Sequence, residues 1–192
     1  MVGASPTQAI ARSSARFVFT APTPAAGATT IDIPLNTATA VTINWTNNGV
    51  PVAGLPVSFS TSRGTISGSP ATTNALGSTT GVTVLSTSAT GAGPAIISAS
   101  GPGGVPAATL DVVFVATTAT NVTVQAVPGT VGFTTGSGSQ TNNSSTISVL
   151  GRDSSNNLVK NAIVNLPLTP DTTVGRLTPM TATNDVTGRA AV

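Results

Sequence analysis

"AVTINWTNNGVPVAGLPVSFS", residues 40–60, is the stretch that decides the fold predicted from this sequence. In its first part, Val41, Ile43 and Trp45 fall on one face of an extended chain, and threonine and asparagine fall on the other. This period-two alternation is typical of a half-buried β-strand. The Asn-Asn-Gly run at 47–49 then favours the positive φ angles of a tight turn. The stretch therefore predicts a β-hairpin.

The alternation resumes after the turn, with Leu55, Val57 and Phe59 on one face. Glycine and proline separate further short alternating segments, which lie at 63–67, 81–86, 95–100 and 109–116. Several short strands at this spacing within about 100 residues indicate a β-sandwich. Only 5 Phe and 1 Trp occur among 192 residues, so aliphatic side chains must supply most of the core. We predict an all-β fold.

The polar inventory argues against an enzyme. His, Cys and Tyr are absent, every acidic residue is Asp, and Lys160 is the single lysine. General acid–base catalysis and zinc sites depend largely on the missing side chains. We therefore expect no catalytic activity and no cofactor. The net charge of +2 arises from dispersed residues without a basic run, so we expect no nucleic-acid binding either.

Composition also bears on location. No run of about 18 apolar residues is present, so we expect no membrane-spanning helix. Charged residues make up 6% of the chain, against about 25% in ordinary soluble domains, which favours a bacterial extracellular protein. The N-terminus does not look like a secretory signal, because Arg12 and Arg16 interrupt any apolar segment. We therefore expect this chain to be a piece of a longer protein.

The sequence contains a long internal repeat. Four pairs of segments or residues match in order: 16–24 with 121–129, 40–60 with 146–168, Gly64 with Gly175, and Gly77 with Gly188. A repeat of about 105–110 residues indicates a domain duplication, because solenoid repeats are shorter, about 20–50 residues. We predict a disordered or linking N-terminus at 1–16, an immunoglobulin-like β-sandwich at 17–116, and a second such sandwich at 117–192 that lacks its last strands.

Two explanations of the incomplete second sandwich stay open at this point. Either the chain is a fragment of a longer array of domains, or a partner supplies the missing strands. The predicted core residues are Val41, Ile43, Trp45, Val57 and Phe59 in the first copy, and Ile147, Val149, Val164 and Leu166 in the second.

Both copies carry an ordered series of short motifs. The first copy has "PVAGLPVSF" (51–59), "GTI" (64–66) and "TTNALGSTTGVTV" (72–84), and the second has "LVKNAIVNL" (158–166), "GRL" (175–177) and "TNDVTGRAAV" (183–192). This series resembles the bacterial immunoglobulin-like domains of the invasin/intimin type (group 1), in tandem. The first copy departs from the family pattern by lacking the usual Asp after its second strand. Asp153 is the candidate for that position in the second copy.

The resemblance implies a non-catalytic spacer in the stalk of a bacterial cell-surface adhesin. Its partners would be neighbouring immunoglobulin-like repeats of a longer chain, and any host-cell or surface ligand would be bound through other modules. The protein would be extracellular, anchored in the outer membrane through parts outside this chain. Two alternatives are a carbohydrate- or partner-binding immunoglobulin-like module, and an incomplete subunit completed by strand addition from a partner.

Three groups of residues are candidate sites. Asp153, Ser155 and Asn157 place oxygen-bearing side chains at alternate positions, as in a calcium loop, but Asp, Ser and Asn also favour hairpin turns. Lys160 could form an isopeptide crosslink with Asn161 or Asn165. That reaction needs a buried acid as proton shuttle, and the chain has no Glu, so we expect a solvated strand lysine.

Trp45 is the third candidate. An exposed Trp45 or Phe133 would favour a carbohydrate-binding surface, on which sugar rings stack against aromatic side chains. The position of Trp45 on the same face as Val41 and Ile43 instead predicts the core tryptophan of a sandwich.

Overall fold

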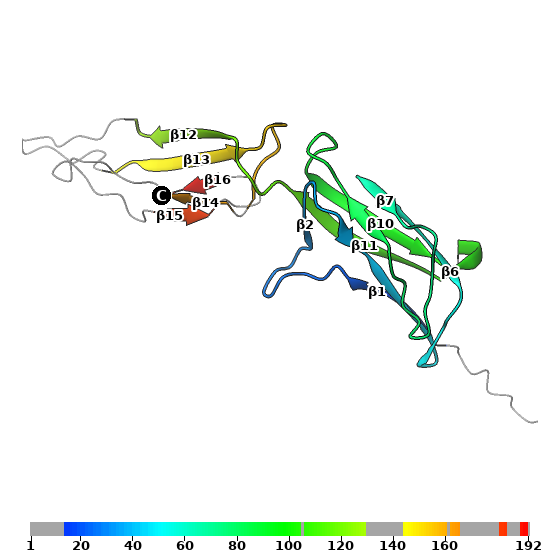
Figure 1. Ribbon diagram of the computed structural model, residues 1–192. Helices are drawn as coiled ribbons and strands as arrows, with labels where there is room; N and C mark the ends of the chain where they lie inside the picture. Colours follow the sequence, from blue (N-terminus) through cyan, green and yellow to red (C-terminus); the bar gives the residue numbers. More distant parts are fainter. Residues whose placement is uncertain are drawn as a thin grey trace, which may run out of the picture. The chain divides into compact units, whose positions relative to one another are not determined.

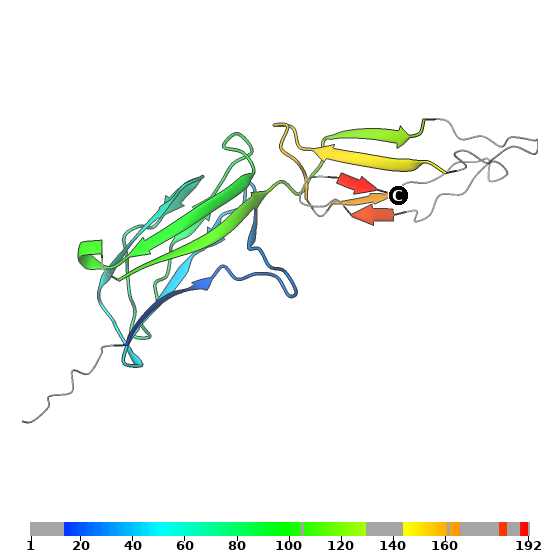
Figure 2. The same ribbon diagram turned by 180° about the vertical axis from the view of Figure 1, so that it is seen from behind.

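The computed structural model describes residues 14–104, 106–129, 144–160, 162–165, 181–183 and 189–191. Every element in these residues is a β-strand except η1, a 3-10 turn at Pro102–Gly104, so the predicted all-β class is confirmed. Figures 1 and 2 show the strands from opposite sides. The chain divides into two compact units: unit 1 comprises Met1–Thr23, Thr39–Val84 and Ile96–Leu110, and unit 2 comprises Pro24–Ala38, Leu85–Ala95 and Asp111–Val192.

The predicted hairpin lies in unit 1. Its sheet has the order β1-β4-β5, with bounds β1 (Ala15–Ala21), β4 (Thr42–Asn47) and β5 (Val50–Pro51). Asn47 pairs with Val50, which leaves a two-residue turn between β4 and β5. Both turn residues have positive φ, 50° at Asn48 and 79° at Gly49, as a type I′ turn requires. The predicted tight turn is confirmed.

The other edge of β4 pairs with residues 77–82. The backbone N–H groups of Val41 and Trp45 donate to the carbonyls of Val82 and Gly77, at 2.9 and 2.8 Å. The chain beyond this segment continues as β9 (Thr83–Leu85), in a sheet of order β3-β9-β7 with β3 (Thr39–Ala40) and β7 (Thr65–Ser67). A side chain at Gly77 would collide with the carbonyl oxygen of Trp45, so only glycine allows this close approach.

A second sheet has the order β2-β11-β10-β6-β8. Its strands are β2 (Asp32–Pro34), β11 (Ala107–Val115), β10 (Gly93–Ser100), β6 (Pro56–Thr61) and β8 (Ala71–Thr72). In unit 1 the ring of Phe19 on β1 meets that of Phe59 on β6 at 6.5 Å, so these strands belong to facing sheets. One side of unit 1 consists of β1, β4, β7 and residues 77–85, and the other consists of β6, β10 and β11. This is the distribution of strands in an immunoglobulin-like sandwich.

The predicted core residues of the first copy are buried. Val41, Ile43 and Val57 have no exposed surface, and Trp45 and Phe59 are each 8% exposed. Leu55, which continues the same alternation, differs, because it is 37% exposed. It precedes the start of β6 at Pro56 and therefore lies beyond the end of the buried face.

The later strands of unit 2 form a sheet of order β12-β13-β16 and a separate pair, β14 and β15. Their bounds are β12 (Asn121–Val127), β13 (Thr146–Arg152), β16 (Arg189–Ala191), β14 (Ile163–Asn165) and β15 (Thr181–Thr183). Val149 is 1% exposed, Ile147 and Val164 are half-buried, and Leu166 lies outside the described residues.

The pairing in unit 2 parallels that in unit 1 at the positions aligned by the repeat. Val149 on β13 pairs with Ala190. The residues aligned with them in the first copy are Ile43 and Thr79, and there the carbonyl of Ile43 on β4 accepts a hydrogen bond from the N–H of Thr79. On the smaller pair, Val164 lies opposite Ala182, as Val57 lies opposite Ala71. The division into domains at residues 116 and 117 stays a prediction.

Candidate functional site

The segment 153–157 forms a tight turn after β13, within unit 2. The backbone N–H groups of Ser155 and Asn157 donate to Asp153 Oδ1 at 2.9 and 2.8 Å, and Asn157 Nδ2 donates to Asp153 Oδ2 at 2.9 Å. Asn156 has a φ of 68°, which closes the turn. Arg152 then pairs with Leu158 in an antiparallel bridge. Asp153 therefore shapes this turn through its own carboxylate.

The environment of Asp153 holds its carboxylate in the charged form. The side chain is 7% exposed, and this burial by itself raises its pKa. Hydrogen bonds from the side chain and backbone of Asn157, from the backbone of Ser155 and from the Ser88 hydroxyl outweigh burial, so the pKa of Asp153 lies below its ordinary value. The backbone N–H groups of Ser155 and Asn157 and the side-chain amide of Asn157 thus engage both carboxylate oxygens within the turn itself.

The calcium candidates Asp153, Ser155 and Asn157 are therefore brought together as a hairpin turn. No group of three or more His, Cys, Asp or Glu side chains that could hold a metal ion occurs in the described part of the chain. Ser155 contributes its backbone N–H to the turn, and the side chain of Asn157 is used in other hydrogen bonds.

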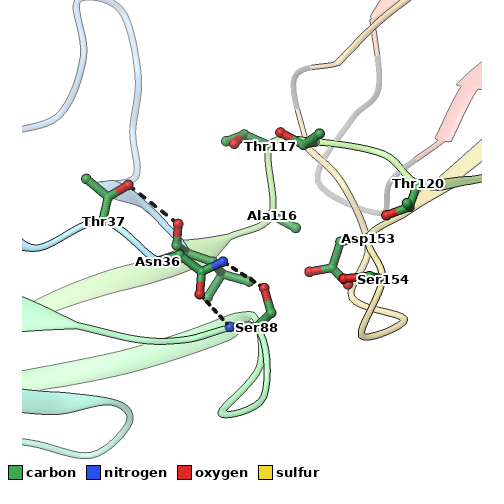
Figure 3. A pocket seen from close by; sticks show the side chains of 10 residues that line it. Asn36, Thr37, Ser88, Ala116, Thr117, Thr120, Asp153 and Ser154 are labelled. Carbon is green, nitrogen blue, oxygen red and sulfur yellow. Dashed lines mark hydrogen bonds between the residues drawn. The ribbon is translucent and has the colours of Figure 1, made fainter.

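The side chain of Asn157 connects the turn to the segment 88–92. Its Oδ1 accepts from the backbone N–H of Ala92 at 3.0 Å, and its Nδ2 donates to the carbonyl of Ser88 at 3.0 Å. Asn36 holds the other side of this segment, because its Nδ2 donates to Ser88 Oγ at 2.8 Å and its Oδ1 accepts from Ser88 N at 3.0 Å (Figure 3). We call Asn36, Ser88, Ala92, Asp153 and Asn157 the amide clamp.

A polar cavity of about 360 Å³ lies beside the amide clamp, and Figure 3 shows its lining. Most of the side chains around it carry hydroxyl groups: Thr37, Ser88, Thr117, Thr118, Thr120 and Ser154. Its one carboxylate, that of Asp153, already accepts three hydrogen bonds within the turn. The cavity has no aromatic side chain in its lining on which a sugar ring could stack.

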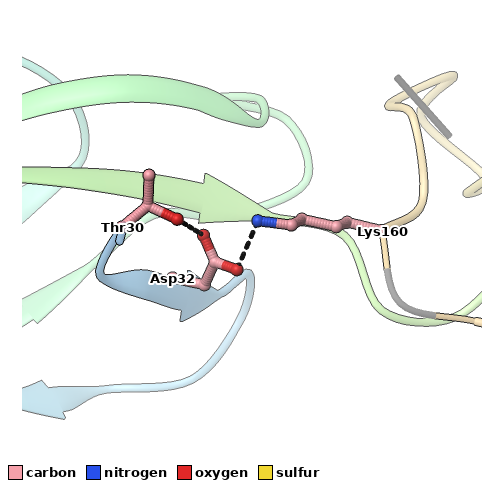
Figure 4. Close-up of polar contacts among 3 residues, drawn as sticks. All are labelled: Thr30, Asp32 and Lys160. Carbon is pink, nitrogen blue, oxygen red and sulfur yellow. Dashed lines mark hydrogen bonds and ion pairs between the residues drawn. The ribbon is translucent and has the colours of Figure 1, made fainter. Parts of the chain in front are cut away.

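Lys160 forms a second connection within unit 2. Its Nζ lies 2.6 Å from Asp32 Oδ2, and the two side chains are 14% and 24% exposed (Figure 4). The hydroxyl of Thr30 donates to Asp32 Oδ1 at 3.3 Å. The backbone N–H of Lys160 donates to the carbonyl of Ala116 at 2.9 Å. The prediction of a solvated strand lysine is therefore wrong, because a carboxylate on β2 meets the ammonium group and removes most of its contact with water.

The isopeptide candidates are not brought together in the described residues. Asn161 lies outside those residues, and Asn165 is an exposed residue of β14. The acceptor that faces the Lys160 ammonium is the carboxylate of Asp32.

Trp45 does not form an exposed aromatic platform. Its ring is buried and packs edge-to-face against Phe17, with centroids 5.4 Å apart and an angle of 87° between the planes. The other described phenylalanines are buried or half-buried, and Phe133 lies outside the described residues.

Asn36, Ser88 and Asp32 have roles that the sequence reasoning missed. Asp32 lies between the buried residues Ile31 and Ile33, and this alternation does indicate that its side chain points away from the core. No local pattern joins it to Lys160, 128 residues away. For Asn36, the available signal is that Asn tolerates positive φ, here 60°, and often marks a turn.

The described residues include no helix long and apolar enough to cross a membrane. No protein-family model matches the sequence, and a search of curated proteins finds none similar to it. Among solved structures, the chain is similar to one described as the D0-D1 domain of intimin. The two are 26% identical, the match covers 85% of this chain and 79% of that chain, and the TM-score is 0.40.

Proposed function

We propose that this chain is a non-catalytic structural spacer of the invasin/intimin-like stalk type, with tandem immunoglobulin-like domains that hold another part of a bacterial surface adhesin at a distance. The observation that carries the proposal is the set of long-range polar contacts made by residues 153–160. Asn157 bonds to residues 65 and 69 positions earlier, and Lys160 pairs with a residue 128 positions earlier.

A spacer has to hold its successive parts in a fixed arrangement. A short polar segment such as residues 117–120 does not do this by itself, because exposed Thr and Ala residues keep much of their conformational freedom. The amide clamp and the Lys160–Asp32 pair add restraints on either side of this segment. Hydrogen bonds between neutral groups contribute about 0.5–1.5 kcal/mol each, and those to a charged group about 1.5–3 kcal/mol. Together these contacts support a stiff connection.

The chemistry of the same residues supports a non-catalytic role. The Asp153 carboxylate accepts three hydrogen bonds within its own turn, and the Lys160 ammonium is paired with Asp32. A general base needs an accessible lone pair, and an amine nucleophile needs access to its substrate. The partners that both groups have in the fold support a structural role for them.

The low charge content and the ordered family motifs support a place on the bacterial cell surface, with outer-membrane anchoring through other parts of the protein. On this proposal the direct partners are neighbouring immunoglobulin-like repeats. Any receptor or surface ligand is bound elsewhere in the assembly.

Hydrogen exchange at the amide of Ala92 tests the proposed restraint. In the variant Asn157→Ala this amide loses its acceptor, and we expect it to exchange about fivefold faster, which corresponds to the loss of about 1 kcal/mol from local opening. Ser155→Ala is the matched control, because only the backbone N–H of Ser155 contributes to the turn. Equal exchange rates at Ala92 in the wild-type chain and in Asn157→Ala would contradict the proposal.

A further inference from the structure

Strand β2 joins an early part of unit 2 to the end of β11. The two strands pair in parallel, and three pairs of residues lie directly opposite one another: Val113 and Asp32, Phe114 and Ile33, and Val115 and Pro34. The backbone N–H of Val113 donates to the carbonyl of Ile31 at 2.8 Å. The backbone N–H of Leu35 donates to the carbonyl of Val115 at 2.9 Å. All of these residues belong to unit 2, and we call residues 31–35 and 113–115 the shear pair.

Tension along the chain pulls the two halves of the shear pair in opposite directions. Residues 31–35 are pulled back toward the N-terminus and residues 113–115 forward toward the C-terminus, whereas the two strands run in the same direction. The strands are therefore displaced past each other along their length. Hydrogen bonds between parallel strands are evenly spaced, so this displacement strains them together rather than one after another. Separation of the shear pair then requires more than one backbone bond to break in the same step.

The shear pair is shielded from water on both faces. On one face, Ile33 and Phe114 lie opposite each other and are 1% and 0% exposed. On the other face, the side chain of Asp32 is paired with the ammonium group of Lys160 at 2.6 Å (Figure 4). Hydrogen bonds are stronger in such surroundings than in water. Water is also kept from replacing a backbone bond that lengthens under load.

The segment at 159–160 holds the end of β11 in place. Ala116 forms a parallel bridge with Val159, and its carbonyl accepts from the N–H of Lys160 at 2.9 Å. The carbonyls of Val115 and Ala116 thus accept from two different segments. This second attachment opposes sideways displacement of the strand end, so a pull on the following chain is transmitted along β11 into the shear pair.

We infer that the shear pair is a load-bearing element, which carries tension transmitted along the chain and sets the rate at which unit 2 opens under that tension. The inference deepens the proposed spacer function and rests on it, because a spacer transmits any pull between the parts that it separates. Forced unfolding is governed by the rate of unfolding rather than by equilibrium stability. A few bonds that break together are therefore sufficient to resist a pull.

Single-molecule force measurement on the whole chain tests the inference, since the chain has no cysteine and attachment points can be introduced singly. In the shear arrangement, Thr29→Cys and Ala119→Cys attach the handles before residues 31–35 and after residues 113–115. In the peel arrangement, Ala38→Cys and Ala119→Cys place both handles at the same end of the pair. All three positions are exposed. At one constant force, the first extension should take at least about fivefold longer in the shear arrangement, the effect of one further backbone bond that breaks in the same step.

Two variants at one position test the bonds themselves. Val113→Pro removes a donor of the shear pair, and Val113→Ala is the matched control because it keeps that donor. In the shear arrangement, Val113→Pro should extend about fivefold sooner than Val113→Ala. In the peel arrangement the two should extend equally, because the bond between Leu35 and Val115 lies nearer the handles and breaks first. Circular dichroism verifies that both variants remain folded.

Two results would overturn the inference. The first is an equal waiting time in the shear and peel arrangements, a comparison that changes no residue of the pair. The second is an equal waiting time for Val113→Pro and Val113→Ala in the shear arrangement. Neither result would alter the hydrogen exchange of Ala92, which is measured without load and depends on Asn157. Failure of the load-bearing element and failure of the proposed restraint are therefore distinguishable.

Discussion

Gly77 provides a quantitative test of how the first sandwich is held together. Its φ is +72°, and an added Cβ would collide with the carbonyl oxygen of Trp45 and lie 3.2 Å from the backbone nitrogen of Val52. That nitrogen donates to the same carbonyl at 3.0 Å, and Trp45 N donates to the Gly77 carbonyl at 2.8 Å. The substitution Gly77→Ala therefore strains the backbone and separates two hydrogen-bonded groups.

The expected cost follows from these contacts. A positive φ costs an alanine about 1–2 kcal/mol relative to glycine. Disruption of the two backbone hydrogen bonds adds about 1 kcal/mol each. The variant should therefore be destabilised by about 3–4 kcal/mol, a large part of the 5–15 kcal/mol that is typical of a folded protein. Gly49→Ala is the control, because Gly49 has a similar φ of +79° but would place its Cβ with nothing within 4 Å.

Urea unfolding followed by Trp45 fluorescence measures both variants, since Trp45 is the only tryptophan in the chain. Gly49→Ala should lose about 1–2 kcal/mol, the cost of the backbone conformation alone. Equal destabilisation of the two variants would refute the argument, because the contact between Gly77 and Trp45 would then contribute nothing beyond the φ angle.

Three further predictions concern single groups. Thr79→Val should cost about 1–3 kcal/mol in urea unfolding, because the fully buried Thr79 hydroxyl accepts from Ile43 N–H at 3.0 Å and valine would leave that donor unpaired; an unchanged midpoint would contradict this. Because the pKa of Asp153 is lowered in the folded state, its carboxylate stabilises the fold fully above the unfolded-state pKa of about 3.9, and this stabilisation is lost as the pH falls through the folded-state pKa. The difference in unfolding free energy between the wild-type chain and Asp153→Asn should therefore shrink in acid. A difference that does not change with pH would contradict the lowered pKa. Intact-mass measurement should give the mass of the sequence, because Lys160 and Asp32 form an ion pair; the loss of one water would instead indicate an amide bond between them.

Local sequence chemistry was sufficient to predict the hairpin of the first copy. Asn48 and Gly49 are residue types that accept positive φ, and the alternating residues before them identify the buried face without reference to any distant segment. Leu55 shows where this reasoning ends. Alternation predicts which face a side chain occupies, but it does not predict how far along the strand the facing sheet extends.

The contacts of the candidate site could be predicted only in part. The turn at Asp153 follows from residues within four positions, which is why Asp, Ser and Asn in that order predict it. The ion pair of Lys160 depends instead on Asp32 of β2. Strand β2 pairs in parallel with β11, and the segment that carries Lys160 follows β11 in the chain. No periodicity in the sequence records such a contact, because it arises from the strand order of the folded sheet.

The central claim is that residues 153–160 fix the arrangement of the segments within unit 2. The chain has no cysteine, so Ala26→Cys and Gln125→Cys introduce two unique, exposed positions for spin labels in that unit. Pulsed electron paramagnetic resonance then gives the distribution of distances between the labels. We predict one narrow distribution for the otherwise wild-type chain and a broad one when Asn157→Ala and Lys160→Met are added. A broad distribution before those substitutions, or a narrow one that persists after them, would contradict the account.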